Sequence, residues 1–192
     1  MIQALADGMA RYVVKNDETA DQEVLAYGYG LLIMAASTYF AVITSALLLG
    51  VFREMIIAMG VYMLMRTTIG GCHANHRVIC FVSYSGVLYL SIVLAGFVTV
   101  SWQIAIALYL VNVMLIVLFA PGDTAEQPIV KNRFLRRITG VIFITCLFST
   151  YIFFSHMQTE VNIAMFVSTS TCVFLHPLVY KAYGCERSTY QG

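Results

Sequence analysis

Six apolar stretches dominate the hydrophobic pattern of the chain, at residues 28–50, 55–69, 79–100, 103–119, 138–155 and 162–180. Several approach the ~20 residues that a helix needs to cross a bilayer. Backbone groups in lipid must be satisfied within their own segment, and no stretch alternates apolar and polar positions like a barrel strand. The pattern predicts an all-α polytopic membrane protein with about six transmembrane helices, residues 1–192 forming one membrane-embedded domain.

Residues 55–69 form the weakest of these predicted spans. The stretch is short, and Arg66 lies near its inner end. A short segment of this kind can also enter and leave the bilayer on the same side, as a re-entrant helix. Both alternatives stay open at this point, and the cytoplasmic location of residues 66–78 depends on which of them is correct.

The N-terminal residues also show helical spacing, although they are too polar to span a bilayer. Apolar side chains recur with a helical period, at Ile2, Leu5, Ala6, Met9, Ala10 and Val13, and charged side chains occupy another face, at Asp7, Arg11 and Lys15. This pattern predicts a short amphipathic helix that lies in the membrane interface. The same charges interrupt any signal-peptide core, so we expect no cleavage here.

Composition and charge placement extend the membrane assignment. Hydrophobic residues make up 60% of the chain and charged residues 11%, far from the usual soluble range. Orientation follows the positions of lysine and arginine rather than the net charge of +1. With the N-terminus inside, only Arg53 falls outside, and the cytoplasmic residues are Arg11, Lys15, Arg66, Arg77, Lys131, Arg133, Arg136, Arg137, Lys181 and Arg187. We therefore predict a multi-pass cell-membrane protein with both termini in the cytoplasm.

Polar side chains inside the predicted spans are few. Asn112 lies in the middle of the fourth span, and His176 precedes Pro177 in the last one. A polar group in the bilayer needs a hydrogen-bond partner, and a proline frees backbone groups that need one too. We interpret both residues as members of interhelical hydrogen bonds rather than as catalytic groups.

Reactive side chains gather in "GGCHANHRVIC", residues 70–80, which holds Cys72, His73, His76 and Cys80. Zinc accepts such ligands, but structural zinc sites usually join ligand pairs from separated segments, and these four share one short strip. The chain has five cysteines, an odd number, and no CxxC motif, which argues against a disulfide framework. We therefore expect no metal and no cofactor, and we favour a nucleophilic cysteine with a histidine partner.

Spacing alone does not settle which histidine serves Cys80. In an unbroken helix His76 and Cys80 are i and i+4, with adjacent side chains. His73 and Cys80 are two turns apart, roughly 10.5 Å of rise, which is too far for a hydrogen bond. His73 can serve Cys80 only if the chain bends, and Gly70 and Gly71 place a helix breaker just before it.

A second cytoplasmic loop, "APGDTAEQPIVKNRFLRR" at residues 120–137, combines helix breakers with a basic cluster. Pro121, Gly122 and Pro128 interrupt helix. The basic cluster consists of Lys131, Arg133, Arg136 and Arg137. Such a cluster can act simply as a topology anchor on anionic lipid headgroups, or it can contact a substrate.

Together these residues resemble a known family. Arg66, Gly70-Gly71, His73-Ala74 and Cys80, followed by "APGDTAEQPI", are similar to the motifs of the AgrB (accessory gene regulator B) membrane endopeptidases of Gram-positive quorum-sensing systems, over essentially the whole chain. The resemblance implies that His73 and Cys80 are the catalytic pair and that Arg66 and Gly71 are needed for activity. It assigns a supporting or substrate-binding role to the basic residues at 131, 133, 136 and 137, where this chain carries more arginine than the lysine-rich family pattern.

The resemblance also implies a reaction. A cysteine endopeptidase of this family removes the C-terminal tail of an AgrD-like propeptide through an acyl-enzyme thioester, and the peptide then closes to a thiolactone or lactone. The partners it implies are this propeptide, membrane lipids and a second copy of the chain in a homodimer, with no nucleic acid. The main rival is a small transporter or channel with Arg66 and His73 along a polar path, and a scaffold with a decayed motif is the third alternative.

Overall fold

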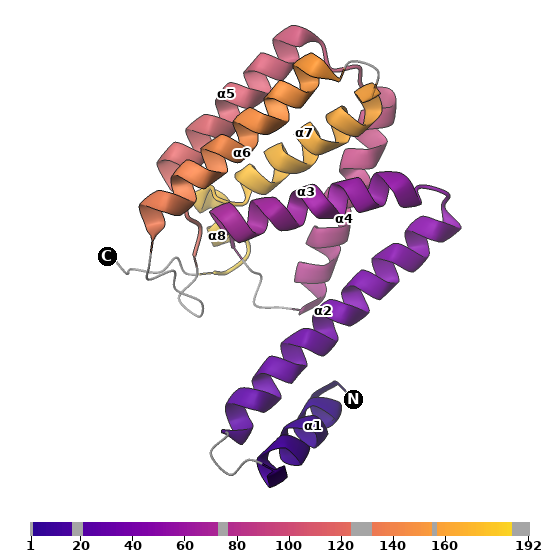
Figure 1. The fold of residues 1–192 in the computed structure, drawn as a ribbon, viewed down its shortest axis with the longest axis vertical. Helices are drawn as coiled ribbons and strands as arrows, with labels where there is room; N and C mark the ends of the chain where they lie inside the picture. The colour runs from indigo at the N-terminus through magenta and orange to yellow at the C-terminus, as the bar shows by residue number, and fades with distance from the viewer. Residues whose placement is uncertain (1, 17–20, 73–76, 124–131, 155–156, 186–192) are drawn as a thin grey trace. The chain divides into compact units, whose positions relative to one another are not determined.

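A computed structural model describes residues 2–16, 21–72, 77–123, 132–154 and 157–185 of the chain. These residues form helices and no strand, which confirms the predicted all-α class. The helices are α1 (Ile2–Asn16), α2 (Gln22–Leu48), α3 (Phe52–Ile69), α4 (Arg77–Phe97), α5 (Trp102–Phe119), α6 (Arg133–Phe153), α7 (Gln158–Val173) and α8 (Pro177–Ala182). Figure 1 shows them in order along the chain.

Residues 1–52 form a compact unit of their own, made of α1 and α2. The side chain of Asp21 caps α2 by accepting hydrogen bonds from the backbone N–H groups of Glu23 (2.9 Å) and Val24 (3.4 Å). The predicted N-terminal helix is confirmed as α1, which packs against α2 with Ala6 and Ala10 fully buried. Its location in the membrane interface stays a prediction.

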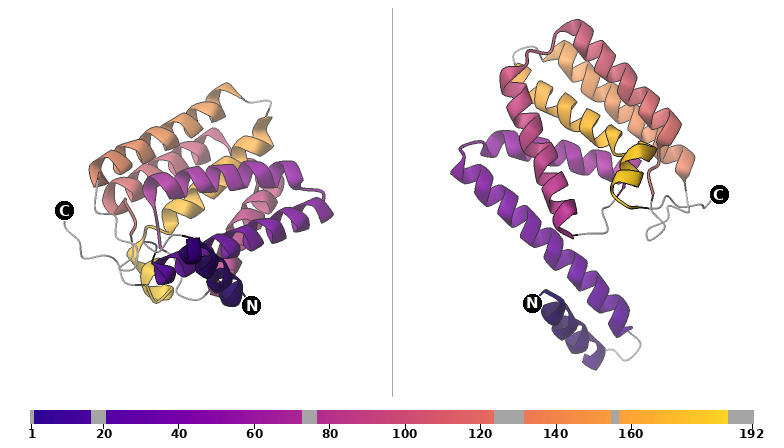
Figure 2. Two further views of the ribbon diagram at one scale, coloured as in Figure 1. Left: turned by 60° about the horizontal axis from the view of Figure 1, so that its bottom comes forward. Right: turned by 180° about the vertical axis from the view of Figure 1, so that it is seen from behind.

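Residues 53–192 form the second unit, in which α7 is the central helix. Helices α4, α5 and α6 all pack against α7, as the views in Figures 1 and 2 show. Nine of the 16 residues of α7 are buried, whereas α6 buries two of 21. Because protein surrounds α7, its polar side chains find partners within the helix and on neighbouring segments. Thr171 Oγ1 donates to the carbonyl oxygen of Val167 at 2.7 Å, and Asn162 Nδ2 donates to that of Val98 at 3.4 Å.

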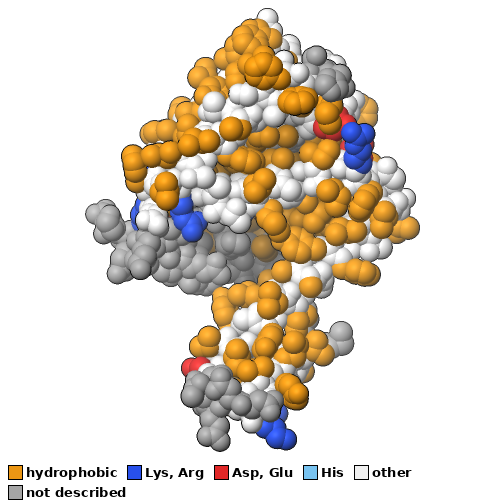
Figure 3. Space-filling view, viewed as in Figure 1, with side chains coloured by type: hydrophobic (Ala, Val, Ile, Leu, Met, Phe, Trp, Pro, Cys, Tyr) orange, Lys and Arg blue, Asp and Glu red, His pale blue; other side chains and the backbone are white. Residues whose placement is uncertain are grey.

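Among the residues that the structure describes, four helices are long and apolar enough to cross a membrane: α2 and, in the second unit, α5, α6 and residues Val78–Phe97 of α4. Large hydrophobic side chains remain exposed along their faces, and Figure 3 shows such side chains spread over one face. These surfaces suit lipid. Helix α3 is a continuous helix of 18 residues with three charged side chains, so neither a full span nor a re-entrant path is confirmed for it.

The last predicted span, residues 162–180, is not one helix. Helix α7 ends at Val173 and α8 begins at Pro177, where proline cannot continue a helix. His176 caps α8, its Nδ1 accepting from the Leu178 N–H at 3.3 Å, in place of the interhelical bond we expected. Asn112 does make the predicted interhelical bond, donating from Nδ2 to Thr169 Oγ1 of α7 at 3.1 Å.

Charged groups lie at the two ends of α3. Arg53, in its first turn, forms an ion pair of 2.9 Å with Glu160 of α7. Arg66, in its last turn, belongs to the end where the loops after α3 and α5 meet. This separation of polar ends by an apolar body is the arrangement expected of a membrane-embedded unit, and it positions both sequence motifs at one end.

Candidate active site

The two motif loops pair with each other although they are far apart in the sequence. Gly70 and Gly122 form an isolated parallel β-bridge. The N–H of Gly71 donates to the carbonyl oxygen of Gly122 at 2.9 Å, and the N–H of Gly122 donates to that of Ile69 at 2.8 Å. Two backbone hydrogen bonds therefore connect the end of α3 to the loop after α5.

The two glycines that end α3 have conformations and surroundings that exclude a side chain. Gly70 has φ 73° and Gly71 has φ 131°, both in the region that favours glycine. A Cβ on Gly70 would overlap the carbonyl oxygen of Gly122, and a Cβ on Gly71 would overlap the guanidinium of Arg66. The predicted helix break is confirmed, and a side chain at either position would force the backbone or its neighbours to shift.

Arg66 anchors the segment that follows α3. Its Nη1 donates to the carbonyl oxygen of Gly70 at 3.2 Å, and its Nη2 donates to that of Cys72 at 2.7 Å. A cation at a helix C-terminus is favoured by the helix dipole, and arginine can bridge two carbonyls with its planar fork. These contacts support a structural role for Arg66 in shaping the loop that carries the motif.

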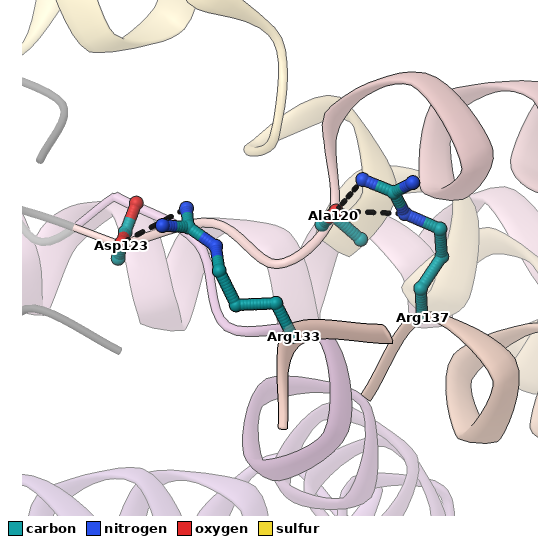
Figure 4. A network of polar contacts seen from close by, with 4 residues as sticks. All are labelled: Ala120, Asp123, Arg133 and Arg137. Atoms are coloured by element: carbon teal, nitrogen blue, oxygen red, sulfur yellow. Dashed lines mark hydrogen bonds and ion pairs between the residues drawn. The ribbon is translucent and has the colours of Figure 1, made fainter. Parts of the chain in front are cut away.

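Two arginines of α6, Arg136 and Arg137, also donate hydrogen bonds to backbone carbonyl groups in this region. Nε and Nη2 of Arg137 both donate to the carbonyl oxygen of Ala120, at 3.1 and 2.8 Å (Figure 4). Nη1 of Arg136 donates to the carbonyl oxygen of Thr67 near the end of α3, at 3.1 Å. The first turns of α6 therefore bind one motif loop and the helix end before the other, which favours the supporting role for these arginines.

A third arginine of α6, Arg133, forms an ion pair with a buried carboxylate. Its Nη2 lies 3.1 Å from Oδ2 of Asp123, whose side chain has no exposed surface, while 27% of the arginine side chain is exposed (Figure 4). A buried carboxylate needs a positive partner, because the cost of its desolvation is otherwise large. Lys131, the remaining member of the basic cluster, lies outside the described residues.

Cys72 carries a buried thiol, which makes it a poor candidate for the reactive cysteine. It packs with Tyr180 and Cys185 in a small cluster of buried residues. Burial raises the pKa of the Cys72 thiol to about 11, and the positive charge of Arg66 offsets only part of that increase. Since the thiolate is the reactive form, Cys72 is a poor nucleophile at neutral pH.

A pH series of alkylation tests this difference. Because the pKa of Cys72 is raised to about 11, its reaction with iodoacetamide should be very slow at neutral pH and should rise about tenfold for each pH unit until that value is approached. Mass spectrometry of the alkylated chain measures the modification at each cysteine separately. Equal rates at Cys72 in the folded and the denatured protein at neutral pH would contradict the prediction.

Cys80 lies in the first turn of α4, which begins at Arg77, and it is half-buried. The free backbone N–H groups and the dipole at a helix N-terminus favour a negative group there. His73 and His76 lie outside the described residues, so the choice between them is untested.

The sequence model of one family, described as "AgrB: Accessory gene regulator B", matches residues 6–176 of the chain. The chain belongs to the AgrB family. Comparison with curated proteins and with solved structures found no significant match. Membership, together with the apolar helices, makes this a membrane protein with a role in the processing of quorum-sensing peptides.

The AgrB motif residues have one close neighbour that the sequence analysis missed, the side chain of Tyr62. The guanidinium carbon of Arg66 lies 5.7 Å from the centre of its ring. Its i, i+4 spacing from Arg66 on α3 was the available signal, but a tyrosine in an apolar span looks like an ordinary packing residue.

The AgrB fold offers no grouped metal ligands in the part of the chain that the structure describes: no three side chains of His, Cys, Asp or Glu come together there. Two of the four zinc-ligand candidates, Cys72 and Cys80, are described, and burial raises the pKa of the first.

Proposed function

We propose that this AgrB-family protein is a membrane cysteine endopeptidase that removes the C-terminal tail of an AgrD-like propeptide. One observation carries the proposal: of the two thiols in the motif, Cys80 is partly accessible in the first turn of α4, whereas Cys72 is buried and its pKa is raised to about 11. The contrast supports Cys80 as the nucleophile, in agreement with the family motif.

In this mechanism the thiolate of Cys80 attacks the carbonyl carbon at the tail junction. His73 takes the thiol proton as a general base and then gives it to the leaving amine as a general acid. The resulting acyl-enzyme thioester passes its acyl group to a cysteine or serine within the peptide, which closes a thiolactone or lactone. Thioester exchange is nearly balanced in energy, so no ATP is needed if water is kept away from the intermediate.

The arginines around the motif support this chemistry by fixing the backbone. Arg66 bonds the carbonyls of Gly70 and Cys72, and Arg136 and Arg137 bond those of Thr67 and Ala120. Their positive charge also complements an acidic tail on the substrate, a role that Lys131 shares in the proposal. The same basic residues favour a cytoplasmic active site, with both termini on that side.

The test is co-expression with the propeptide encoded beside the chain, read by mass spectrometry of the peptide products. Cys80→Ala and His73→Ala should abolish tail removal, because each removes a group that makes or breaks a bond. Cys72→Ala and His76→Ala are the matched controls and should process the peptide. Loss of processing in His76→Ala with retention in His73→Ala would reverse the histidine assignment. Full processing by all four variants would remove the endopeptidase proposal and favour a transporter.

A further inference from the structure

Tyr62 occupies the contact between α3 and α4 next to the candidate site. Its ring meets that of Tyr84 edge to face, with ring centres 5.0 Å apart. The Arg66 guanidinium lies over the same Tyr62 ring at 5.7 Å. The Tyr62 phenol therefore lies between α3, which ends at the motif, and α4, which begins within it.

Helical spacing relates this tyrosine pair to the nucleophile. Arg66 follows Tyr62 by four residues on α3, and Cys80 precedes Tyr84 by four residues on α4, so each lies one turn further along the same face. Both steps, about 6 Å along each helix, lead toward the loop that joins the two helices. Because Tyr62 contacts Tyr84 and Cys80 lies one turn from Tyr84 on the same face of α4, Tyr62 and Cys80 face the same space.

The hydroxyl of Tyr62 is prepared to donate a hydrogen bond. The Arg66 guanidinium lies 5.7 Å from the centre of the Tyr62 ring, and a phenol O–H can donate a hydrogen bond to an oxygen that binds beside it. The two Arg66 nitrogens Nη1 and Nη2 already bond backbone carbonyls, so the tyrosine is the donor better placed to meet a bound substrate.

We propose that Tyr62 donates a hydrogen bond to the oxygen of the scissile carbonyl when Cys80 attacks it. The inference rests on the proposed endopeptidase function. As the bond between Cys80 Sγ and the carbonyl carbon forms, the π electrons of the C=O bond move to oxygen, and Tyr62 holds that oxyanion without giving up its proton. The guanidinium of Arg66 lies over the ring of the same tyrosine. A donor placed in advance at a developing charge is among the strongest contributions to catalysis.

The test uses Tyr62→Phe, which keeps the ring and its contacts with Tyr84 and Arg66 but removes the hydroxyl. With the purified full-length chain in liposomes and the AgrD-like propeptide, we expect turnover to fall about 100-fold with KM changed by no more than about twofold. Tyr109→Phe is the matched control, since its hydroxyl contacts Thr145 Oγ1 of α6 at 3.3 Å, away from the motif; it should retain turnover.

Alkylation of Cys80 by iodoacetamide, measured by mass spectrometry, provides the second readout, because it needs the thiol but forms no oxyanion. The rate in Tyr62→Phe should stay within about twofold of wild type. Turnover near wild type, or a parallel loss of alkylation and turnover, would overturn the role of Tyr62. Tail removal by Cys80→Ala would instead overturn the proposed function, so the two failures are distinguishable.

Discussion

Alanine at Gly122 should separate the two motif loops and abolish both folded protein and peptide processing. Its Cβ would lie 2.7 Å from the Cα and the nitrogen of Gly71 and 2.7 Å from the hydroxyl of Tyr180. Backbone cannot give way as a flexible side chain does, so the bridge and its two hydrogen bonds would have to open. Overpacking and the loss of both bonds together predict a loss of about 3 to 5 kcal/mol.

Thermal unfolding of the detergent-solubilised chain, followed by size-exclusion chromatography, measures this loss. Gly60→Ala and Gly86→Ala are the matched controls, because a Cβ at either position meets nothing within 4 Å. Both lie inside helices, where alanine is favoured over glycine by about 0.5 to 1 kcal/mol, so these variants should be as stable as wild type or more so. A Gly122→Ala protein with wild-type stability would show that the loops do not pair as described.

Removal of Arg133 should destabilise the chain more than removal of its partner Asp123. The carboxylate has no exposed surface, while 27% of the arginine side chain reaches solvent. Arg133→Met therefore leaves a buried charge without its ion-pair partner, and we expect a loss of about 3 kcal/mol. In Asp123→Leu the arginine can turn to water, and the expected loss is about 1 kcal/mol.

The double variant Asp123→Leu with Arg133→Met shows what the loss of both charges does to stability, for comparison with the loss of one. Replacement of both charges by apolar groups should recover most of the stability lost in Arg133→Met, because no buried charge then remains. Lys181→Met provides a control for the loss of an exposed positive charge and should change stability by less than about 0.5 kcal/mol. The same thermal measurement applies, and equal losses in the two single variants would contradict the asymmetry.

The long apolar helices could be predicted from the sequence, because an apolar run longer than about 17 residues has few alternatives to a membrane helix. The spans predicted at 28–50, 79–100, 103–119 and 138–155 correspond to α2, α4, α5 and α6. The starts of α2 and α6 were predicted too late. Their first turns, from Gln22 and from Arg133, include charged residues and extend the helix beyond its continuous apolar part.

The contacts at the site were not predictable in the same way. A bridge between Gly70 and Gly122 leaves no periodic pattern, since two glycines in distant loops carry no signal that they will meet. The charge of Arg136 and Arg137 indicated the cytoplasmic side of the membrane, but a count of charges cannot show that their partners are the carbonyls of Thr67 and Ala120. The motif predicts which residues react, whereas the arginine contacts that hold the loops could not be predicted from it.

The central position of α7 has a consequence for how the protein is made. Its 16 residues extend about 24 Å, less than the roughly 30 Å of a bilayer core, and it carries buried Asn162, Ser168 and Thr171. Such a segment is a poor candidate for insertion into lipid by itself. Its three packing partners, α4, α5 and α6, all precede it in the chain. Because synthesis proceeds from the N-terminus, they leave the ribosome first, and α7 can enter the membrane against surfaces that are already in place.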